Sequence, residues 1–223
     1  RLSYFGLPGP NIEDLLDWRD YIDRSTGVER LRKGKSHKDD LDIQHQLMSN
    51  IMLNEIYGFQ LLRGDIENIL IQGQDVDGTK PALSTDEHPL VAHFRYDLAN
   101  LDFFGGIYTD GSGESKRIIS VQKLIERQKG HDFLLLLTLN VRNTADDEYS
   151  KYLEGAERQA ASNHLREHEV ALSWYRSTGE RMERYRLKAL VPLFVRLEAE
   201  RSGFDCFCYP PLSYTGGSRK IRV

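Results

Sequence analysis

The chain has 223 residues, of which 39 % are hydrophobic and 29 % charged, and its formal net charge is −4. This balance is typical of a globular domain with an apolar core, and it excludes the strong overall basic field of many nucleic-acid-binding proteins, although it leaves room for a local basic patch. The longest strongly apolar run, residues 133–137, is far too short to cross a bilayer, so no membrane association is expected. Because the only two cysteines stand two positions apart and no leader-like segment is visible, we expect a cytoplasmic location.

Short apolar runs alternate along the chain with segments of helical periodicity. A strand at 2–5 is followed by a tight Gly-Pro turn and a helix in which Asn11 is the expected N-cap and Ile22 belongs to the apolar stripe. Further strands are predicted at 25–28, 59–63, within 91–106, 131–142, 204–214 and at the end of the chain. Further helices are predicted at 41–57, at 117–128 and in the charged segment 145–201, while residues 72–90 form a loop or insertion.

The strand predicted at 131–142 contains the most apolar stretch of the chain, which indicates a strand buried on both faces. Strands that alternate with helices form parallel sheets with right-handed crossovers. The sequence therefore predicts a single α/β domain over 1–223, with a doubly wound, mostly parallel sheet and helices on both faces.

Glycines and acidic residues follow the predicted strands. Gly6 and Gly9 come after the first strand, Glu29 after the second, Asp65 after the third, and Asn100 lies in the fourth strand segment. The carboxyl ends of parallel strands meet at one edge of a sheet, where ligands bind at the point at which the strand order reverses. Glycine lets the backbone approach a ligand, and a carboxylate can accept hydrogen bonds from ribose hydroxyls or an amine. The pattern predicts one binding crevice at this edge.

This layout resembles that of the class I S-adenosylmethionine-dependent methyltransferases. "YFGLPG", "GVE" and "RGDIENIL" stand where this family has its first three cofactor motifs, and "NLDFFGG" stands where it has its catalytic motif. The resemblance implies a Rossmann-like fold and S-adenosylmethionine as cofactor. The first motif departs from the family pattern, because no acidic residue precedes Gly6 and Gly6-x-x-Gly9 replaces the usual Gly-x-Gly-x-Gly.

The resemblance also assigns roles to residues. Tyr4, Gly6 and Gly9 would shape the methionine end of the site, and Glu29 would hold the ribose. The adenine would lie against Asp65 and Ile66, and the methyl acceptor would lie against Asn100 and Asp102 as the catalytic residues.

Other readings of the same residues stay open. Acidic residues and glycines after strands are common in proteins that bind nothing there, and the irregular first motif also suits a catalytically silent, methyltransferase-like subunit of a larger assembly. The basic segment 180–188 would contact a nucleic acid or a protein partner, or form an ordinary solvated helix face. The His-x-x-Glu-His pattern at 164–168 has no obvious third zinc ligand, so no metal site is predicted.

Overall fold

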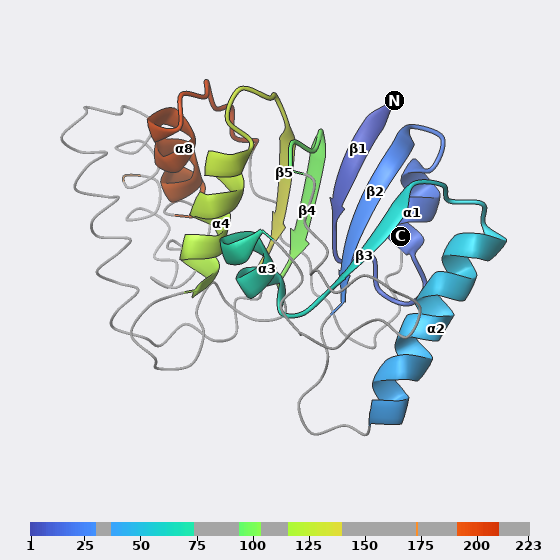
Figure 1. Ribbon diagram of the computed structural model, residues 1–223. Helices are drawn as coiled ribbons and strands as arrows, with labels where there is room; N and C mark the ends of the chain where they lie inside the picture. The colour runs from blue at the N-terminus through green and yellow to red at the C-terminus, as the bar shows by residue number, and fades with distance from the viewer. Residues whose placement is uncertain (30–36, 74–93, 104–115, 140–172, 174–190, 210–223) are drawn as a thin grey trace.

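The computed structural model describes residues 1–29, 37–73, 94–103, 116–139, 173 and 191–209 (Figure 1). Five parallel strands form one sheet in the order β3-β2-β1-β4-β5. Their bounds are β1 Leu2–Gly6, β2 Ile22–Glu29, β3 Phe59–Arg63, β4 Leu98–Asp102 and β5 Leu134–Thr138. The described helices are α1 Glu13–Trp18, α2 His37–Leu53, α3 Ile66–Gln72, α4 Lys116–Arg127 and α8 Val191–Arg201.

Helices cover both faces of the sheet, so the predicted doubly wound, Rossmann-like α/β fold is confirmed (Figure 1). One core lies under α3, α4 and α8 and takes Phe5, Ala99 and Leu101 from the sheet. The other lies under α1 and α2 and takes Tyr4 and Leu98. The division follows from the alternation of side chains along a strand, which sends neighbouring residues to opposite faces.

The first helix is shorter than predicted, and its N-cap is not Asn11. α1 ends at Trp18, and Ile22 begins β2. The residue at the N-cap is Ile12, with a positive φ of 52° and no side-chain cap, while Asn11 Oδ1 accepts a hydrogen bond from Gln46 Nε2 at 3.4 Å. Since Ile12 is fully buried in the α1–α2 core, packing outweighs the local preference for a polar cap.

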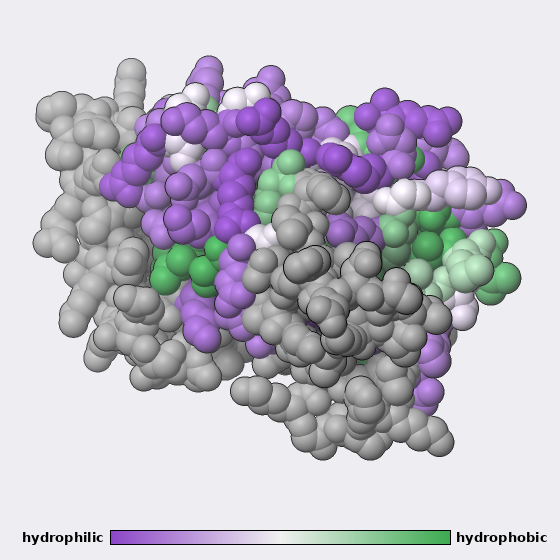
Figure 2. Space-filling view, in the orientation of Figure 1, coloured by the Kyte–Doolittle hydropathy of each residue, from purple (hydrophilic) through white to green (hydrophobic). Residues whose placement is uncertain are grey.

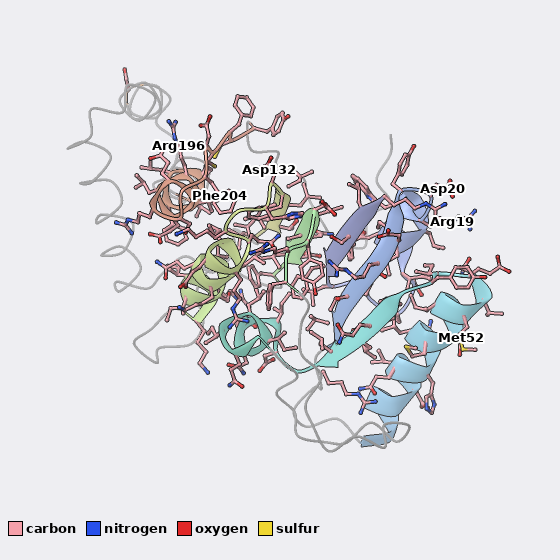
Figure 3. The ribbon with its side chains drawn as sticks, turned by 45° about the horizontal axis from the view of Figure 1, so that its top comes forward. Arg19, Asp20, Met52, Asp132, Arg196 and Phe204 are labelled. Atoms are coloured by element: carbon pink, nitrogen blue, oxygen red, sulfur yellow. The ribbon has the colours of Figure 1, made fainter. Side chains whose placement is uncertain are left out.

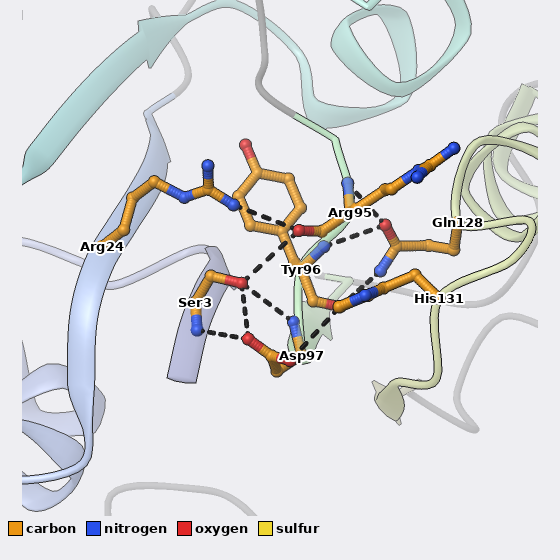
Figure 4. A network of polar contacts seen from close by, with 7 residues as sticks. All are labelled: Ser3, Arg24, Arg95, Tyr96, Asp97, Gln128 and His131. Atoms are coloured by element: carbon orange, nitrogen blue, oxygen red, sulfur yellow. Dashed lines mark hydrogen bonds and ion pairs between the residues drawn. The ribbon is translucent and has the colours of Figure 1, made fainter. Parts of the chain in front are cut away.

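The fourth strand is also shorter than predicted, because a glutamine side chain binds the segment before it. Gln128 Oε1 accepts hydrogen bonds from the N–H groups of Arg95 and Tyr96, each at 2.9 Å, and its Nε2 donates to Tyr96 O (Figure 4). Gln128 is fully buried, and Arg95 has a positive φ of 85°. The main-chain groups of Arg95 and Tyr96 are therefore satisfied by a side chain, whereas Asp97 N already donates to Ser3 O of the neighbouring strand at 3.0 Å.

A second set of polar contacts lies at the amino end of β1 and β4. Asp97 Oδ2 accepts hydrogen bonds from Ser3 N and Ser3 Oγ, each at 2.7 Å, and Asp97 Oδ1 lies 3.2 Å from His131 Nε2 (Figure 4). Burial would raise the pKa of Asp97, but the hydrogen bonds from Ser3 and the nearby His131 outweigh it and lower that pKa. These contacts tie β1, β4 and the segment before β5 together at the edge opposite the predicted site.

Two further strand predictions are wrong in part. β5 is shorter than 131–142 and is not buried on both faces, because Leu134 and Leu136 are 41 % and 38 % exposed. β5 pairs with β4 and is the last strand of the sheet within the part of the chain that the structure describes. Residues 204–209 have no regular secondary structure, so the described part of the strand predicted at 204–214 is absent. The predicted helix at 41–57 is α2, which begins earlier and ends at Leu53.

Exposed apolar side chains gather in an area where α2 ends. Met52, Leu53 and Tyr57 are each more than 70 % exposed in this area, which Figure 2 shows at the end of α2 that leads to β3. The predictions for 74–90, for the histidine pattern at 164–168, for the basic segment 180–188 and for the final strand fall outside the described residues.

Candidate functional site

The parallel strands bring the predicted site segments to one edge of the sheet. Gly6 pairs with Gly27 on one side and with Asn100 on the other, and Glu29 pairs with Arg63. All five arrowheads in Figure 1 point to the same edge. The point at which the chain order reverses lies between β1 and β4, so the carboxyl ends of these two strands border the position where ligands bind in open α/β sheets.

A polar cluster occupies this position. We call Tyr4, Asp14, Asn100 and Asp102 the switch-point cluster. Tyr4 lies on the α1–α2 face of β1, and Asn100 and Asp102 lie on the same face of β4, because they are two and four residues beyond Leu98. Asp14 comes from the first turn of α1, and its Oδ2 accepts a hydrogen bond from Asn100 Nδ2 at 2.6 Å. Three elements thus contribute to one group of polar side chains.

Tyr4 is buried, yet its hydroxyl makes no hydrogen bond of ordinary geometry within the described residues. Burial and the neighbouring carboxylate of Asp14 raise the pKa of Tyr4, so the phenol stays protonated at neutral pH. A buried hydroxyl without a partner costs stability and is a group that a ligand or water can satisfy.

Asp102 is the last residue of β4 and is exposed. Partial burial of the carboxyl and the nearby negative charge of Asp14 raise its pKa. Two carboxylates that repel each other favour a cationic group between or beside them, and the raised pKa makes Asp102 a better proton acceptor than an ordinary carboxylate.

The two glycines of the first turn differ in their surroundings. A Cβ atom on Gly6 would lie 2.3 Å from Tyr4 Oη and 2.8 Å from Asn100 O, so glycine is needed there for the packing of β1 against β4. Gly9 has a positive φ of 61°, and a Cβ atom on it would meet nothing within 4 Å. Gly6 is therefore explained by the protein's own packing, whereas Gly9 lies in an open turn whose backbone needs glycine.

Glu29 and Asp65 lie at the ends of neighbouring strands. Glu29 is half-buried, and its main-chain oxygen accepts a hydrogen bond from Gly64 N at 3.1 Å, one residue before Asp65. Asp65 is the N-cap residue of α3, but its side chain does not cap the helix. Ile66 is 6 % exposed and packs in the α3–α4–α8 core. Its burial alone accounts for an apolar residue at this position, and the predicted contact with adenine stays a prediction.

Sequence reasoning missed the part that Asp14 plays in the cluster. By itself, an aspartate in the first turn of a helix indicates only a favourable interaction with the helix dipole. The available signal was its place in the first turn after the β1 loop, on the helix that packs against Tyr4 and Leu98. The structure brings it to Asn100, 86 residues away in the chain.

No protein-family model, curated protein or solved structure matches this chain. Among the described residues no group of three or more His, Cys, Asp or Glu side chains is arranged to hold a metal ion. No helix in the same part of the chain combines the length and apolar character needed to span a bilayer.

Proposed function

We propose that the chain binds S-adenosylmethionine at the carboxyl edge of β1, β2 and β3 and transfers its methyl group to an acceptor beside β4. The observation that carries the proposal is the switch-point cluster, which places two carboxylates, an amide and a buried phenol where the strand order reverses. S-adenosylmethionine carries an ammonium and a sulfonium group, and both are cations that carboxylates attract.

Asp14 supplies the acid that the first motif lacks. The family pattern has an acidic residue before the first glycine, and this chain has none there. In the fold, the carboxylate of Asp14 lies beside Tyr4 and Asn100 instead, one helical turn after the loop. In this proposal Asp14 accepts a hydrogen bond from the ammonium group of the methionine moiety. Glu29 accepts hydrogen bonds from the ribose hydroxyls, and Asp65 accepts one from the adenine amine.

Methyl transfer would depend mainly on how the protein positions the acceptor relative to the cofactor. The cofactor supplies an electrophilic methyl group when bound, and the protein must align an acceptor in line with it and exclude water. Asn100 and Asp102 border the acceptor position. Asp102, with its raised pKa, can take the proton that an amine or hydroxyl acceptor loses.

Calorimetric titration with S-adenosylmethionine and S-adenosylhomocysteine tests the proposal. Asp14→Asn is expected to weaken binding about tenfold or more, because a hydrogen bond to a charged group contributes about 1.5–3 kcal/mol. Glu13→Gln is the matched control, since it removes one charge from the same helical turn at an exposed position, and its affinity should stay within about twofold.

The same titration separates the alternatives. Equal affinities of the wild type, Asp14→Asn and Glu29→Gln would refute the assigned site. Binding in the wild type without methyl transfer to any offered amine, hydroxyl or nucleic acid, measured with a labelled methyl group, would indicate the catalytically silent subunit. A bound ligand also raises the melting temperature, because at a ligand concentration 100 times the Kd it adds about 2.7 kcal/mol to the free energy of unfolding.

A further inference from the structure

The two cysteines of the chain lie next to each other on the segment that follows α8. Cys206 Sγ and Cys208 Sγ are 3.9 Å apart, and no other cysteine occurs among the 223 residues. Residues two apart on an extended segment point to the same side, which accounts for the approach. Phe204 anchors the segment by packing against Phe133, with ring centroids 5.5 Å apart. Figure 3 shows Phe204 beside α8, which also carries Arg196.

The surroundings of the two thiols differ. Cys206 is half-buried and packs against the α3–α4–α8 core, whereas Cys208 is exposed. The hydrogen bond between the thiols raises the pKa of Cys206, and burial adds to this rise. The same hydrogen bond lowers the pKa of Cys208 to about 7; burial and the charge of Glu200 oppose this fall, and the charge of Arg196 adds to it. The exposed sulfur therefore carries negative charge near neutral pH while the inner sulfur keeps its proton.

We propose that Cys208 and Cys206 form a peroxide-oxidised thiol pair, in which exposed Cys208 reacts first and Cys206 resolves it into an intrachain disulfide. The Cys208 thiolate attacks one oxygen of hydrogen peroxide, the O–O bond breaks, and the leaving hydroxide takes a proton to become water. The product is a sulfenic acid on Cys208. The Cys206 sulfur then attacks the Cys208 sulfur, the S–S bond forms, and the hydroxyl group leaves as water with the Cys206 proton. The two thiols lose two electrons and two hydrogens, and one peroxide becomes two waters.

The geometry permits the second step. A disulfide needs about 2.05 Å between sulfurs, so the pair must close by about 1.9 Å from its 3.9 Å separation. Residues 204–209 have no regular secondary structure, so the movement breaks no main-chain hydrogen bond of a strand or helix and gives up only the weak contact of Cys208 Sγ with Pro192 O at 3.8 Å. A ring closed over a single intervening residue is strained, which makes the disulfide easy to reduce and the oxidation reversible.

A metal site is the competing use of two close thiols. Two sulfurs bound to tetrahedral zinc at about 2.3 Å are about 3.8 Å apart, close to the observed separation. However, no third His, Cys, Asp or Glu side chain completes a metal site among the described residues. Arg196 and Glu200, which form an ion pair at 2.9 Å, place opposite charges near both sulfurs, so these neighbours add no net negative charge that would attract a cation. These observations favour oxidation.

Stepwise oxidation of the reduced chain with hydrogen peroxide, followed by intact-mass measurement and peptide mapping, tests the proposal. The expected product is a monomer that has lost two hydrogens and has one disulfide between Cys206 and Cys208. In Cys206→Ser, a sulfenic acid on Cys208 should accumulate and react with a dimedone probe. In Cys208→Ser, no disulfide forms, and Cys206 should react more slowly than Cys208 does in the wild type.

The pH profile of alkylation tests the roles of the neighbours. Cys208 should react with iodoacetamide with a midpoint near pH 7, and the midpoint should rise in Cys206→Ala and in Arg196→Gln. At pH 7 about half of Cys208 is thiolate, against about 3 % of a free cysteine. A less basic thiolate is also a weaker nucleophile, which offsets much of this gain. We therefore expect Cys208 to react with iodoacetamide about three times faster than free cysteine does at this pH. A midpoint near that of free cysteine, disulfide-linked dimers, further oxidation of both sulfurs without a disulfide, or one zinc ion retained per chain after dialysis would each overturn the proposal.

Discussion

The contact between Gly6 and the switch-point cluster gives the most direct test of the site geometry. In Gly6→Ala, the new Cβ atom would meet Tyr4 Oη at 2.3 Å, Tyr4 Cζ at 2.7 Å and Asn100 O at 2.8 Å. Tyr4 is 1 % exposed and cannot swing into solvent without opening the α1–α2 core, and Asn100 O belongs to the paired strand. Overpacking of this kind costs about 2–3 kcal/mol.

The expected loss of stability in Gly6→Ala is smaller than the cost of the overpacking alone. Alanine loses less backbone entropy than glycine in a strand, which returns about 0.5–1 kcal/mol. We therefore expect Gly6→Ala to lower the free energy of unfolding by about 1–2 kcal/mol, a fall of roughly 2–8 °C in melting temperature for a chain of this size. Urea denaturation followed by far-ultraviolet circular dichroism measures it.

A double-mutant cycle links the effect to its cause. Tyr4→Phe removes the nearest contact and a hydroxyl that has no hydrogen bond of ordinary geometry, so alone it should be neutral or stabilising by up to about 1 kcal/mol. Combined with Gly6→Ala it should recover about 0.5–1.5 kcal/mol of the loss, although the contact with Asn100 O remains.

Gly9→Ala is the matched control for this cycle. Its Cβ atom meets nothing within 4 Å, and the substitution costs only the strain of a positive φ, about 1 kcal/mol. Its effect should add to that of Tyr4→Phe within about 0.5 kcal/mol. If Gly6→Ala and Tyr4→Phe were also additive, the packing assigned to the end of β1 would be wrong.

Three further outcomes are expected in urea denaturation. Gln128→Leu should lower the free energy of unfolding by about 2–4 kcal/mol, because three main-chain groups lose their partner; a loss below about 1 kcal/mol would contradict this. The pKa of Asp97 is lower in the folded protein than its unfolded value of 3.8, so the ionised carboxylate stabilises the fold at higher pH. The difference in free energy of unfolding between the wild type and Asp97→Asn should therefore shrink between about pH 5 and pH 3 as Asp97 takes up a proton. A difference that stays constant over this range would exclude this role. Glu67→Gln should cost about 1.5–3 kcal/mol, since Glu67 pairs with Arg117 at 2.8 Å and the two side chains are only 14 % and 10 % exposed. Glu126→Gln, which breaks the exposed pair with Lys123, should cost much less, and equal losses would argue against the distinction.

The sequence by itself determined the alternation of strands and helices, because apolar periodicity is a local property of the chain. Glycines and acidic residues after the strands predicted which segments would meet, since parallel strands all end at one edge. The confirmed parallel sheet has Gly6, Glu29 and Asp102 as the last residues of β1, β2 and β4, close to where the residue pattern predicted the strand ends.

Only the tertiary structure decided which side chains touch. Asp14 approaches Asn100 because α1 packs on the face of the sheet that carries Tyr4, and β4 begins only at Leu98 because Gln128, directly after α4, binds the main chain of Arg95 and Tyr96. Ile12 takes a positive φ in place of a polar cap because burial in the core outweighs a local preference. Each of these contacts joins residues that are far apart in the chain. Their energies depend on how the helices pack on the sheet, and a local sequence pattern contains no information about that packing.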